Sequence, residues 1–217
     1  MKFAIFLSGC GQLDGSETHE VILTLLSLSQ NNIEYDSYSI DTYFEPINHI
    51  TQKKDIANNR NCLIESARLV RGKVKDIKLL NPSEYDALIF PGGSGAITHL
   101  SKWDLINNNL RIEKMVQQKA MLFAKNHKPI GFICIAPIIA SCLYTNPRIT
   151  LGNDPNIIEK AKKLGVIHEE CTATDIVTDL INNIVSTPAN MVRADISEIH
   201  IGIKNLVYKL KELSQKP

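Results

Sequence analysis

The stretch Gly131–Pro137, GFICIAP, places a cysteine where an apolar run ends and a proline follows. A strand that passes abruptly into a helix exposes the residue at the turn, as in the nucleophile elbow of hydrolases. The positive end of the following helix lowers the pKa of a thiol, so Cys134 is predicted to be a reactive thiolate. A buried structural cysteine is the competing interpretation, and position alone does not separate the two.

A second apolar run, YDALIF, ends in the glycine-rich turn PGGSGA. Gly92 and Gly93 allow backbone N–H groups to approach the elbow, and the N–H groups of Gly93 and Ile135 would form an oxyanion hole. The turn lacks the lysine of a P-loop and the spacing of a dinucleotide-binding loop, so a phosphate site is disfavoured. A lone glycine cluster is a weak signal, but beside an elbow it favours chemistry at Cys134.

Two acids, Glu17 and Glu20, open a helix predicted over residues 16–30, with Ser16 as its cap and Asn31–Asn32 as its stop. Its predicted apolar stripe is Ile22, Leu25, Leu26 and Ser29. A carboxyl group reaching over the sheet edge would relay a proton to a thiol. Acids in a first turn also complement the helix dipole on a solvated surface, and the residues alone favour that simpler interpretation.

Histidines test a cysteine–histidine alternative. His19 and His49 are the candidates that could approach the same edge, whereas the other four are typical of surface or packing positions. The His168–Glu169–Glu170 run resembles a His-x-Glu motif and is interpreted as coincidence. Isoleucine, not histidine, follows Cys134.

The composition is that of an ordinary globular protein: 217 residues, 44% hydrophobic and 22% charged, with a net charge of +1. This balance gives no electrostatic footprint for nucleic acid or an anionic membrane and favours a small ligand. No stretch is apolar for long enough to span a bilayer, and MKFAIFLSGC reads as a first strand rather than a signal peptide.

The five cysteines, Cys10, Cys62, Cys134, Cys142 and Cys171, lack the spacing of a zinc site. An odd number of cysteines without an export signal favours free thiols in a reducing compartment. We therefore predict a cytoplasmic location and no metal.

The pattern along the chain alternates strands and helices, which predicts one doubly wound α/β domain over residues 1–217. Residues 41–80 interrupt the rhythm and are predicted to be a helical insertion, with Asp55 as the helix cap. Ligands of such sheets bind at the carboxyl ends of the strands. Four strand ends should meet there: Ser8–Gly11, Pro91–Gly93, Cys134–Pro137 and Thr187–Ala189.

These motifs together resemble a known family. In chain order, LSGCGQLDGSETHE, INHIT, PGGSGA, GFICIAP and STPANM are similar to the ElbB group, which has been described both as isoprenoid or lycopene biosynthesis proteins and as glyoxalases. The group belongs to the PfpI superfamily, which is related to class I glutamine amidotransferases. The resemblance covers nearly the whole chain.

The resemblance implies a flavodoxin-like, mostly parallel sheet with helices on both faces, usually in a homodimer. It implies Cys134 as nucleophile, Glu20 or else Glu17 as its acidic partner, and an oxyanion hole at Gly93 and Ile135. The other expected pocket residues are Gly92, Cys10, His19, His49, Pro188 and Ala189. Many relatives carry a histidine after the cysteine, so Ile135 weakens a protease or amidotransferase assignment.

The implied activity is a cofactor-independent glyoxalase that converts glyoxal or a similar small dicarbonyl to a hydroxy acid through a cysteine hemithioacetal. The expected partner is a small aldehyde, without metal, glutathione or nucleotide. The alternative is a cysteine-based redox sensor or chaperone-like stress protein that supports isoprenoid metabolism with little turnover.

Overall fold

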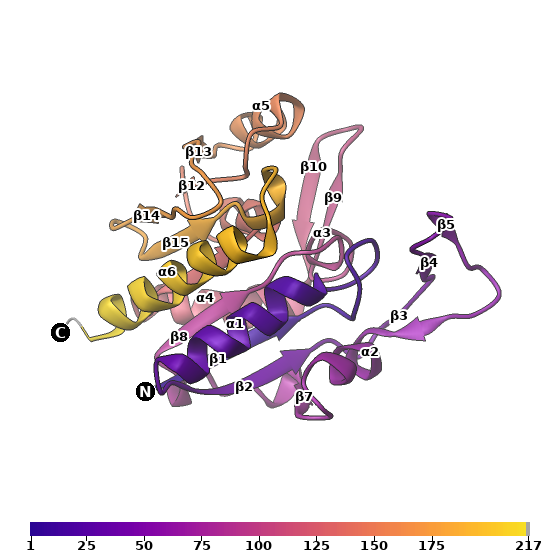
Figure 1. Cartoon of the computed structure of the whole chain (residues 1–217), viewed down its shortest axis with the longest axis horizontal. Coiled ribbons are helices and arrows are strands. Elements are labelled where there is room, and N and C mark those ends of the chain that lie inside the picture. The colour runs from indigo at the N-terminus through magenta and orange to yellow at the C-terminus, as the bar shows by residue number, and fades with distance from the viewer. Residues whose placement is uncertain (216–217) are drawn as a thin grey trace.

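The computed structural model describes residues 1–215 and contains a central seven-stranded sheet in the order β14-β15-β11-β8-β1-β2-β7. Neighbouring strands are parallel except for β14, which runs antiparallel to β15. The strands are β1 (Lys2–Leu7), β2 (Glu34–Ser39), β7 (Val74–Asp76), β8 (Ala87–Phe90), β11 (Ile130–Ile133), β14 (Val177–Asp179) and β15 (Ile184–Thr187). The predicted doubly wound, mostly parallel sheet is confirmed (Figure 1).

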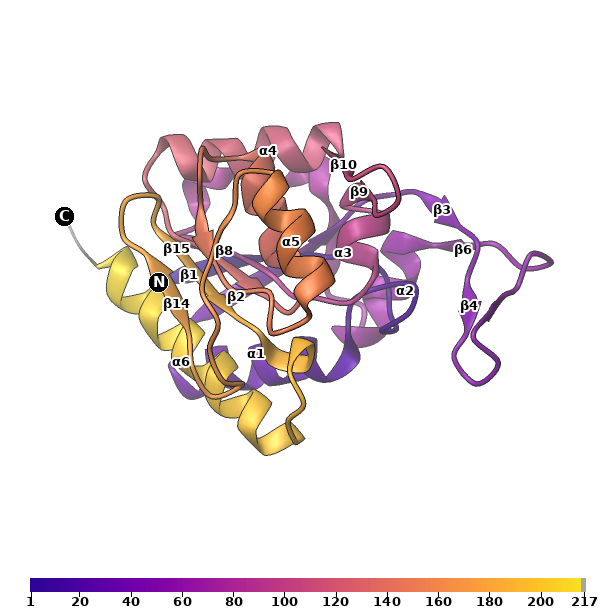
Figure 2. The same cartoon turned by 90° about the horizontal axis from the view of Figure 1, so that it is seen from above.

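Helices cover both faces of the sheet. Figure 2 shows α4 on one side and the adjacent helices α1 and α6 on the other. The α-helices are α1 (Thr18–Gln30), α2 (Cys62–Leu69), α3 (Gly95–Thr98), α4 (Lys114–Lys125), α5 (Pro155–Lys163) and α6 (Ile196–Ser214). The 3-10 helices are η1 (Ile77–Leu79), η2 (Pro82–Glu84), η3 (Ala136–Cys142) and η4 (Ala189–Met191).

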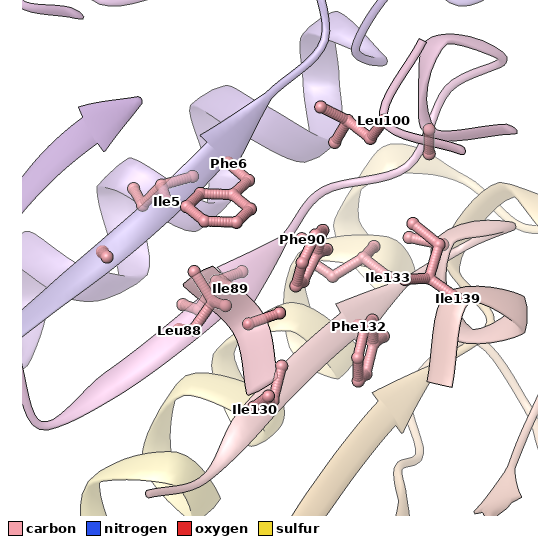
Figure 3. Close-up of a cluster of buried hydrophobic side chains, with 14 of the residues drawn as sticks. Ile5, Phe6, Leu88, Ile89, Phe90, Leu100, Ile130, Phe132, Ile133 and Ile139 are labelled. Carbon is pink, nitrogen blue, oxygen red and sulfur yellow. The ribbon is translucent and has the colours of Figure 1, made fainter. Parts of the chain in front are cut away.

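The core is built on the three central strands, β1, β8 and β11. Because both faces are covered, nearly every residue of these strands is buried and apolar, as expected for a parallel sheet. Phe90 stacks on Phe132 and meets the edge of Phe6, each pair with ring centroids 5.0 Å apart (Figure 3). Burying a ring of this size stabilises the fold by about 1.5–3 kcal/mol. This packing fixes the strand ends that carry the candidate site.

The first helix differs from the prediction in its cap and its buried face. Ser16 does not cap α1, because its hydroxyl accepts the Ser8 N–H at 2.9 Å; Glu17 is the cap. The predicted stripe is wrong, since Ile22 and Leu26 are exposed. Apolar residues lie on both sides of α1, so packing against α6 and the sheet decides which side is buried. That face is Glu20, Val21, Thr24, Ser27 and Leu28.

The predicted insertion at 41–80 is too long. Residues 43–61 form an extension that projects from the sheet, built from the pairs β3 (Tyr43–Phe44) with β6 (Arg60–Asn61) and β4 (Ile47–Asn48) with β5 (Lys53–Lys54) (Figure 1). The helix starts at Cys62 and not after Asp55, because Asn61 accepts the Ile64 N–H and caps it. The helix α2 and β7 belong to the main body, since β7 is an edge strand of the sheet.

Two further segments carry short strand pairs. Residues 109–112 form β10 (Asn109–Ile112), which pairs with β9 (Ser101–Asp104), and α4 begins after Glu113. The strands β12 (Arg148–Ile149) and β13 (Ile167–His168) form a second pair, so His168 lies in a short strand away from the sheet centre. The antiparallel strands β14 and β15 form a hairpin around Asn182–Asn183.

Candidate functional site

Cys134 occupies a sharp turn directly after β11. Its φ of +64° lies in the left-handed region, which is uncommon for a residue other than glycine and costs about 1–3 kcal/mol. Its N–H donates to Thr187 O at 3.0 Å, which continues the β11–β15 pairing by one residue. The side chain is therefore held at the carboxyl edge, as predicted, but it is buried, with 7% of the residue exposed.

The Glu20 carboxyl group lies against Cys134. Glu20 projects from the buried face of α1 and has no exposed surface. Its Oε2 accepts the Gly92 N–H at 3.0 Å, its Oε1 accepts the Asn190 amide at 2.9 Å, and the carboxyl hydrogen-bonds the Cys134 thiol. Burial raises the pKa of Glu20 to about 7 despite these donors, and Glu17 nearby adds to the rise. A carboxyl group that titrates near neutrality can both accept and return a proton.

Gly92 forms the space in which the sulfur and the carboxyl meet. A Cβ at this position would lie 2.4 Å from Cys134 Cβ and 2.6 Å from Glu20 Oε2. Both distances are shorter than a non-bonded contact allows. The absence of a side chain at residue 92 is therefore a geometric requirement of the cysteine–glutamate contact.

The N–H groups of Gly93 and Ile135 both donate to the Cys134 sulfur. Gly93 has φ of +91°, and a Cβ there would lie 2.3 Å from Gly15 O, so the turn also requires glycine at this position. These donors converge on the sulfur, where they stabilise negative charge.

The prediction of a lowered thiol pKa is wrong. Burial raises the pKa of the Cys134 thiol well above its ordinary value, and the adjacent Glu20 charge raises it further. The segment that follows, Ala136–Cys142, is a 3-10 helix rather than an α-helix. Desolvation and the neighbouring carboxylate therefore outweigh the donors from the turn. Ionisation of the thiol depends on giving its proton to Glu20.

Glu17, the alternative acid, has a different position. Its Oε2 accepts the Glu20 N–H at 2.7 Å as the cap of α1, and its Oε1 lies 3.8 Å from His19 Nδ1. The backbone N–H of Glu17 donates to Gly92 O at 3.0 Å. Glu17 thus supports the turn around Gly92 and holds the start of α1, whereas Glu20 contacts the thiol.

Three predicted pocket residues are not brought to the Cys134–Glu20 pair. The side chain of His19 is 62% exposed on α1, and its ionic partner is Glu17. Cys10 hydrogen-bonds Thr18 and lies near the charges of Glu65 and Arg68, on the side of α2. His19 misses the pair because it lies on the exposed side of α1, and Cys10 misses it because its side chain lies toward α2. The strand ends share an edge without sharing a pocket.

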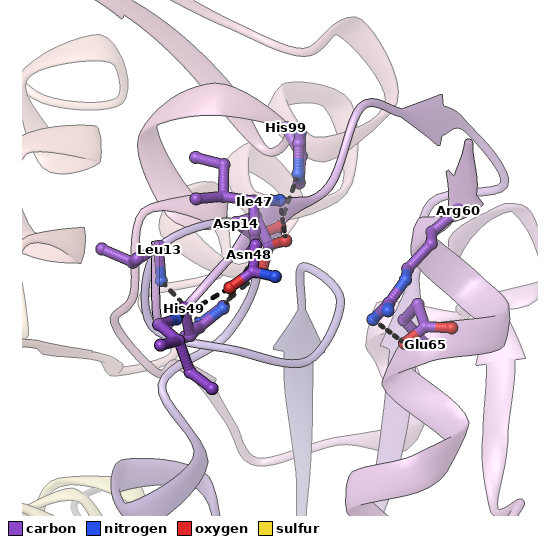
Figure 4. Close-up of polar contacts among 9 residues, drawn as sticks. Leu13, Asp14, Ile47, Asn48, His49, Arg60, Glu65 and His99 are labelled. Carbon is purple, nitrogen blue, oxygen red and sulfur yellow. Dashed lines mark hydrogen bonds and ion pairs between the residues drawn. The ribbon is translucent and has the colours of Figure 1, made fainter. Parts of the chain in front are cut away.

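His49 is the third of these residues, and it binds the loop after β1 instead. Its Nδ1 hydrogen-bonds Ile47 O at 2.9 Å, and its Nε2 accepts the Leu13 N–H at 3.3 Å (Figure 4). Asp14 Oδ2 accepts the Ile47 N–H at 2.6 Å in the same cluster. His49 therefore fastens the projecting extension to the loop and does not face the thiol.

Asn190 is a site residue that the sequence prediction omitted. The predicted pocket stopped at Pro188 and Ala189, which lead into η4; Ala189 has φ of +42°. The next residue, Asn190, supplies the amide that reaches Glu20 Oε1. A usable signal was present, since Asn190 is a polar residue only three positions after the end of the buried strand β15.

A cavity of about 560 Å³ lies elsewhere on the carboxyl edge, beside the ends of β2 and β7. Its wall includes Ile40, Phe44, Ile77, His99 and Met115, and the rings of Phe44 and His99 are 4.5 Å apart. Neither Cys134 nor Glu20 lines it. The chemistry that the side chains support is at the buried pair, so the cavity does not identify the reactive site.

Within residues 1–215, no group of three or more His, Cys, Asp or Glu side chains is arranged to hold a metal ion. No helix in that range is long and apolar enough to cross a membrane.

Solved structures resemble this chain over nearly its full length. A crystal structure from Ehrlichia chaffeensis, described as an isoprenoid biosynthesis protein with an amidotransferase-like domain, matches 98% of this chain and 99% of its own, with a TM-score of 0.91 and 28% identity. Schizosaccharomyces pombe DJ-1 has the same fold, with a TM-score of 0.58 and 17% identity over the whole of both chains. The strand order thus defines the fold of an amidotransferase-like domain, a fold that DJ-1 shares.

Curated proteins with similar sequences show which family the chain belongs to. The rat "ES1 protein homolog, mitochondrial" is 34% identical over 99% of this chain and 85% of its own length. The human "Glutamine amidotransferase-like class 1 domain-containing protein 3, mitochondrial" is also 34% identical, over 99% of this chain and 84% of its own. The chain belongs to this ES1 family. No protein-family model matches it.

The predicted cytoplasmic location is wrong in the light of these relatives, which are named as mitochondrial proteins. The prediction used only an odd number of reduced cysteines and the absence of a recognisable signal peptide. A reducing environment is not confined to the cytoplasm, so neither feature distinguishes the compartments.

Proposed function

We propose that this protein is a cofactor-independent glyoxalase-type enzyme acting on glyoxal or a similarly small dicarbonyl. The observation that supports the proposal is the buried contact of Cys134 with Glu20, whose pKa is raised to about 7. The contact combines a nucleophile, a proton relay and two backbone donors from Gly93 and Ile135. These are the parts that addition to an aldehyde and proton transfer between adjacent carbons require.

In the first step, the Cys134 sulfur attacks an aldehyde carbon, and the C=O π bond opens. Glu20 takes the thiol proton and gives it to the new oxygen, which yields a hemithioacetal. Moving the proton through Glu20 is necessary because the isolated buried thiol has a raised pKa. The Gly93 and Ile135 N–H groups, which hold the sulfur in the free protein, are close enough to stabilise the oxygen as charge develops on it.

In the second step, the Glu20 carboxylate removes the proton from the hemithioacetal carbon, and the electron pair moves onto the adjacent carbonyl to give an enediolate. Glu20 returns that proton to the neighbouring carbon, and the proton of the hemithioacetal hydroxyl group passes to the oxygen on that carbon. One carbon is thereby oxidised to a thioester while the other is reduced to an alcohol, so no external oxidant is needed. Water then cleaves the C–S bond, restores the thiol and releases the hydroxy acid, which is glycolate when the substrate is glyoxal.

The burial of the two site residues favours a small substrate. Only 7% of Cys134 is exposed, and Glu20 is fully buried, so a polypeptide chain has no direct approach to the sulfur. Ile135 occupies the position after the nucleophile, and the side chain that hydrogen-bonds the thiol is a glutamate rather than a histidine. Both features oppose a protease or a glutamine-hydrolysing reaction.

The same features argue against redox sensing as the main role. Sensor cysteines are accessible and have lowered pKa values, because the thiolate is the form that oxidises. Cys134 is buried and its pKa is raised.

The experiment measures glyoxal consumption and glycolate formation by NMR for the wild type, Cys134→Ala and Glu20→Gln. We expect both variants to lose at least about 100-fold in kcat/KM, as removal of a nucleophile or proton relay does. Cys142→Ala is the matched control for the cysteine, and turnover within about threefold of wild type is expected for it. Glu17→Gln tests the alternative acid and should lose less activity than Glu20→Gln, because Glu17 does not contact the thiol. Cys142 is a half-buried thiol in η3, eight positions from the nucleophile.

Full activity in Cys134→Ala would refute the proposal. Selective, reversible oxidation of Cys134 by dilute peroxide in a wild type without turnover would favour the sensor instead, as detected by mass spectrometry. Greater loss in Glu17→Gln than in Glu20→Gln would reassign the proton relay.

A further inference from the structure

Asn190 joins two parts of the chain that are far apart in sequence. It lies on η4 after β15, and its Nδ2 donates to Glu20 Oε1 at 2.9 Å across a separation of 170 residues. We propose that Asn190 is a positioning residue that holds the Glu20 carboxyl group in the orientation that faces Cys134. Its importance for turnover rests on the proposed function, whereas its effect on Glu20 does not.

The first argument is the division of the two carboxyl oxygens between two donors. Gly92 N–H binds Oε2 at 3.0 Å, and Asn190 binds Oε1. A single donor leaves a carboxyl group free to rotate about its last bond, but donors on both oxygens fix its plane. Cys134 then supplies the remaining partner. Proton transfer is sensitive to such alignment, because small displacements from the reactive geometry slow it considerably.

The backbone around Asn190 holds its amide in place. Cys134 N–H donates to Thr187 O at 3.0 Å, and Met191 N–H donates to Pro188 O at 2.9 Å. On the far side, Gly152 packs so closely that a Cβ there would lie 2.4 Å from Met191 O. Ala189 keeps a left-handed φ of +42°, which persists only where surrounding contacts impose it. The amide is thus positioned by the same strand pairing that positions the thiol.

A neutral donor also suits a group that must change protonation. The titratable groups that face Glu20 are Glu17 on its own helix and Cys134 at the end of β11; Gly92 and Asn190, from the other two elements, are uncharged. A lysine or arginine at residue 190 would hold the carboxyl permanently ionised and prevent it from returning a proton. An amide stabilises the carboxylate more weakly than a cation does. It partly offsets the effect of burial on the pKa of Glu20, and the carboxyl group can still be protonated.

The exposure of Asn190 allows a clean test. Asn190 is exposed although Glu20 is fully buried, so a substitution at 190 opens no cavity in the core. The experiment is a ¹³C NMR titration of the Glu20 carboxyl carbon, assigned by its loss in Glu20→Gln, combined with kcat and KM for glyoxal. The variants are Asn190→Ala, Asn190→Asp and Asn190→Gln. Asn156→Ala, an exposed asparagine on α5, is the matched control.

We expect the titration midpoint to rise by about half to one pH unit in Asn190→Ala, because a donor to the carboxylate is lost. It should rise further in Asn190→Asp, where a second carboxylate faces Glu20, and return partly in Asn190→Gln. In Asn190→Ala, kcat should fall about tenfold with KM changed less than twofold. Asn156→Ala should match the wild type in both measurements.

An Asn190→Ala protein whose Glu20 midpoint and kcat both equal those of the wild type would overturn the inference. If no protein, including the wild type, turns over glyoxal but the midpoint still rises in Asn190→Ala, the positioning contact is supported and the proposed function fails. The NMR measurement therefore separates the two conclusions.

Discussion

The Cys134–Glu20 pair and the cavity beside β2 and β7 lie along the same carboxyl edge of the sheet. The pair combines a nucleophile with a carboxyl group whose pKa is raised to about 7, and both residues are buried. The cavity offers about 560 Å³ of space, but its walls include neither of these residues. The loop after β1 borders both places, since Asp14 lines the cavity and Gly15 packs against Gly93.

This difference teaches that open volume and reactivity have separate structural causes. In the proposed function, the pair reacts because burial disfavours charge on two groups that share protons. An open, hydrated pocket would weaken that effect. The cavity exists where the projecting extension meets the body, and two of its lysines, Lys54 and Lys78, already pair with Glu45 and Asp76. The comparison predicts that perturbations at the pair have large effects and perturbations in the cavity have small ones.

The largest effect is expected from Gly92→Ala. The added methyl group would lie 2.4 Å from Cys134 Cβ and 2.6 Å from Glu20 Oε2, so the two groups must separate. Glyoxal turnover should fall at least about 100-fold, measured as kcat/KM. Gly72→Ala is the control: nothing lies within 4 Å of its added Cβ, and its φ of +80° makes strain the main cost. That control should lose about 1 kcal/mol of stability and keep its turnover. Equal turnover in both variants would contradict the role assigned to Gly92.

A smaller effect is expected in the pH dependence of stability. The pKa of Glu20 rises from 4.5 to about 7 on folding, so its contribution is fully present below pH 4.5 and is lost as pH rises to about 7. This difference corresponds to on the order of 3 kcal/mol. Urea unfolding of the wild type and Glu20→Gln from pH 4 to 8 measures it: the wild type should lose stability relative to the variant across this interval. Parallel curves would show that Glu20 titrates normally in the folded protein.

The smallest effect is expected from Met115→Ala in the cavity wall. Met115 is half-buried at the start of α4, on the face of the sheet opposite α1. Its truncation should change kcat/KM for glyoxal by less than about twofold, with a modest loss of stability from reduced burial. A loss greater than tenfold at unchanged stability would connect the cavity to the reaction and remove the distinction drawn above.

The fold followed from the sequence because its signals are local and repeated. The buried runs of β1, β8 and β11, each followed within two residues by glycine or cysteine, predict parallel strands whatever the details of the loops. The helix over residues 18–30 was also predicted, but not its phase, since α1 carries apolar residues on both sides. With the correct phase, Glu20 falls on the same face as Thr24 and Ser27, which distinguishes it from Glu17.

The site was only partly predictable, because its remaining parts depend on long-range packing. Ser16 looks like a helix cap until its hydroxyl is found to bind Ser8. Asn190 has no local motif that connects it to Glu20. The thiol pKa was predicted in the wrong direction because a helix terminus is visible in the sequence, whereas burial beside a carboxylate is not. The sequence predicted that His49 approaches the carboxyl edge of the sheet, but it gave no sign that His49 binds the loop after β1.

The contact between Glu20 and Asn190 also has a consequence for folding. The two residues are separated by 170 positions, and α1 is covered by α6, whose Lys211 Nζ donates to Asn31 O at 3.1 Å. Forming such a non-local contact requires closure of most of the chain. During synthesis the thiol and its proton relay therefore cannot be aligned until residues beyond 190 have left the ribosome and α6 has docked. A nascent chain therefore lacks the aligned contact of Cys134, Glu20 and Asn190 for nearly the whole of its translation.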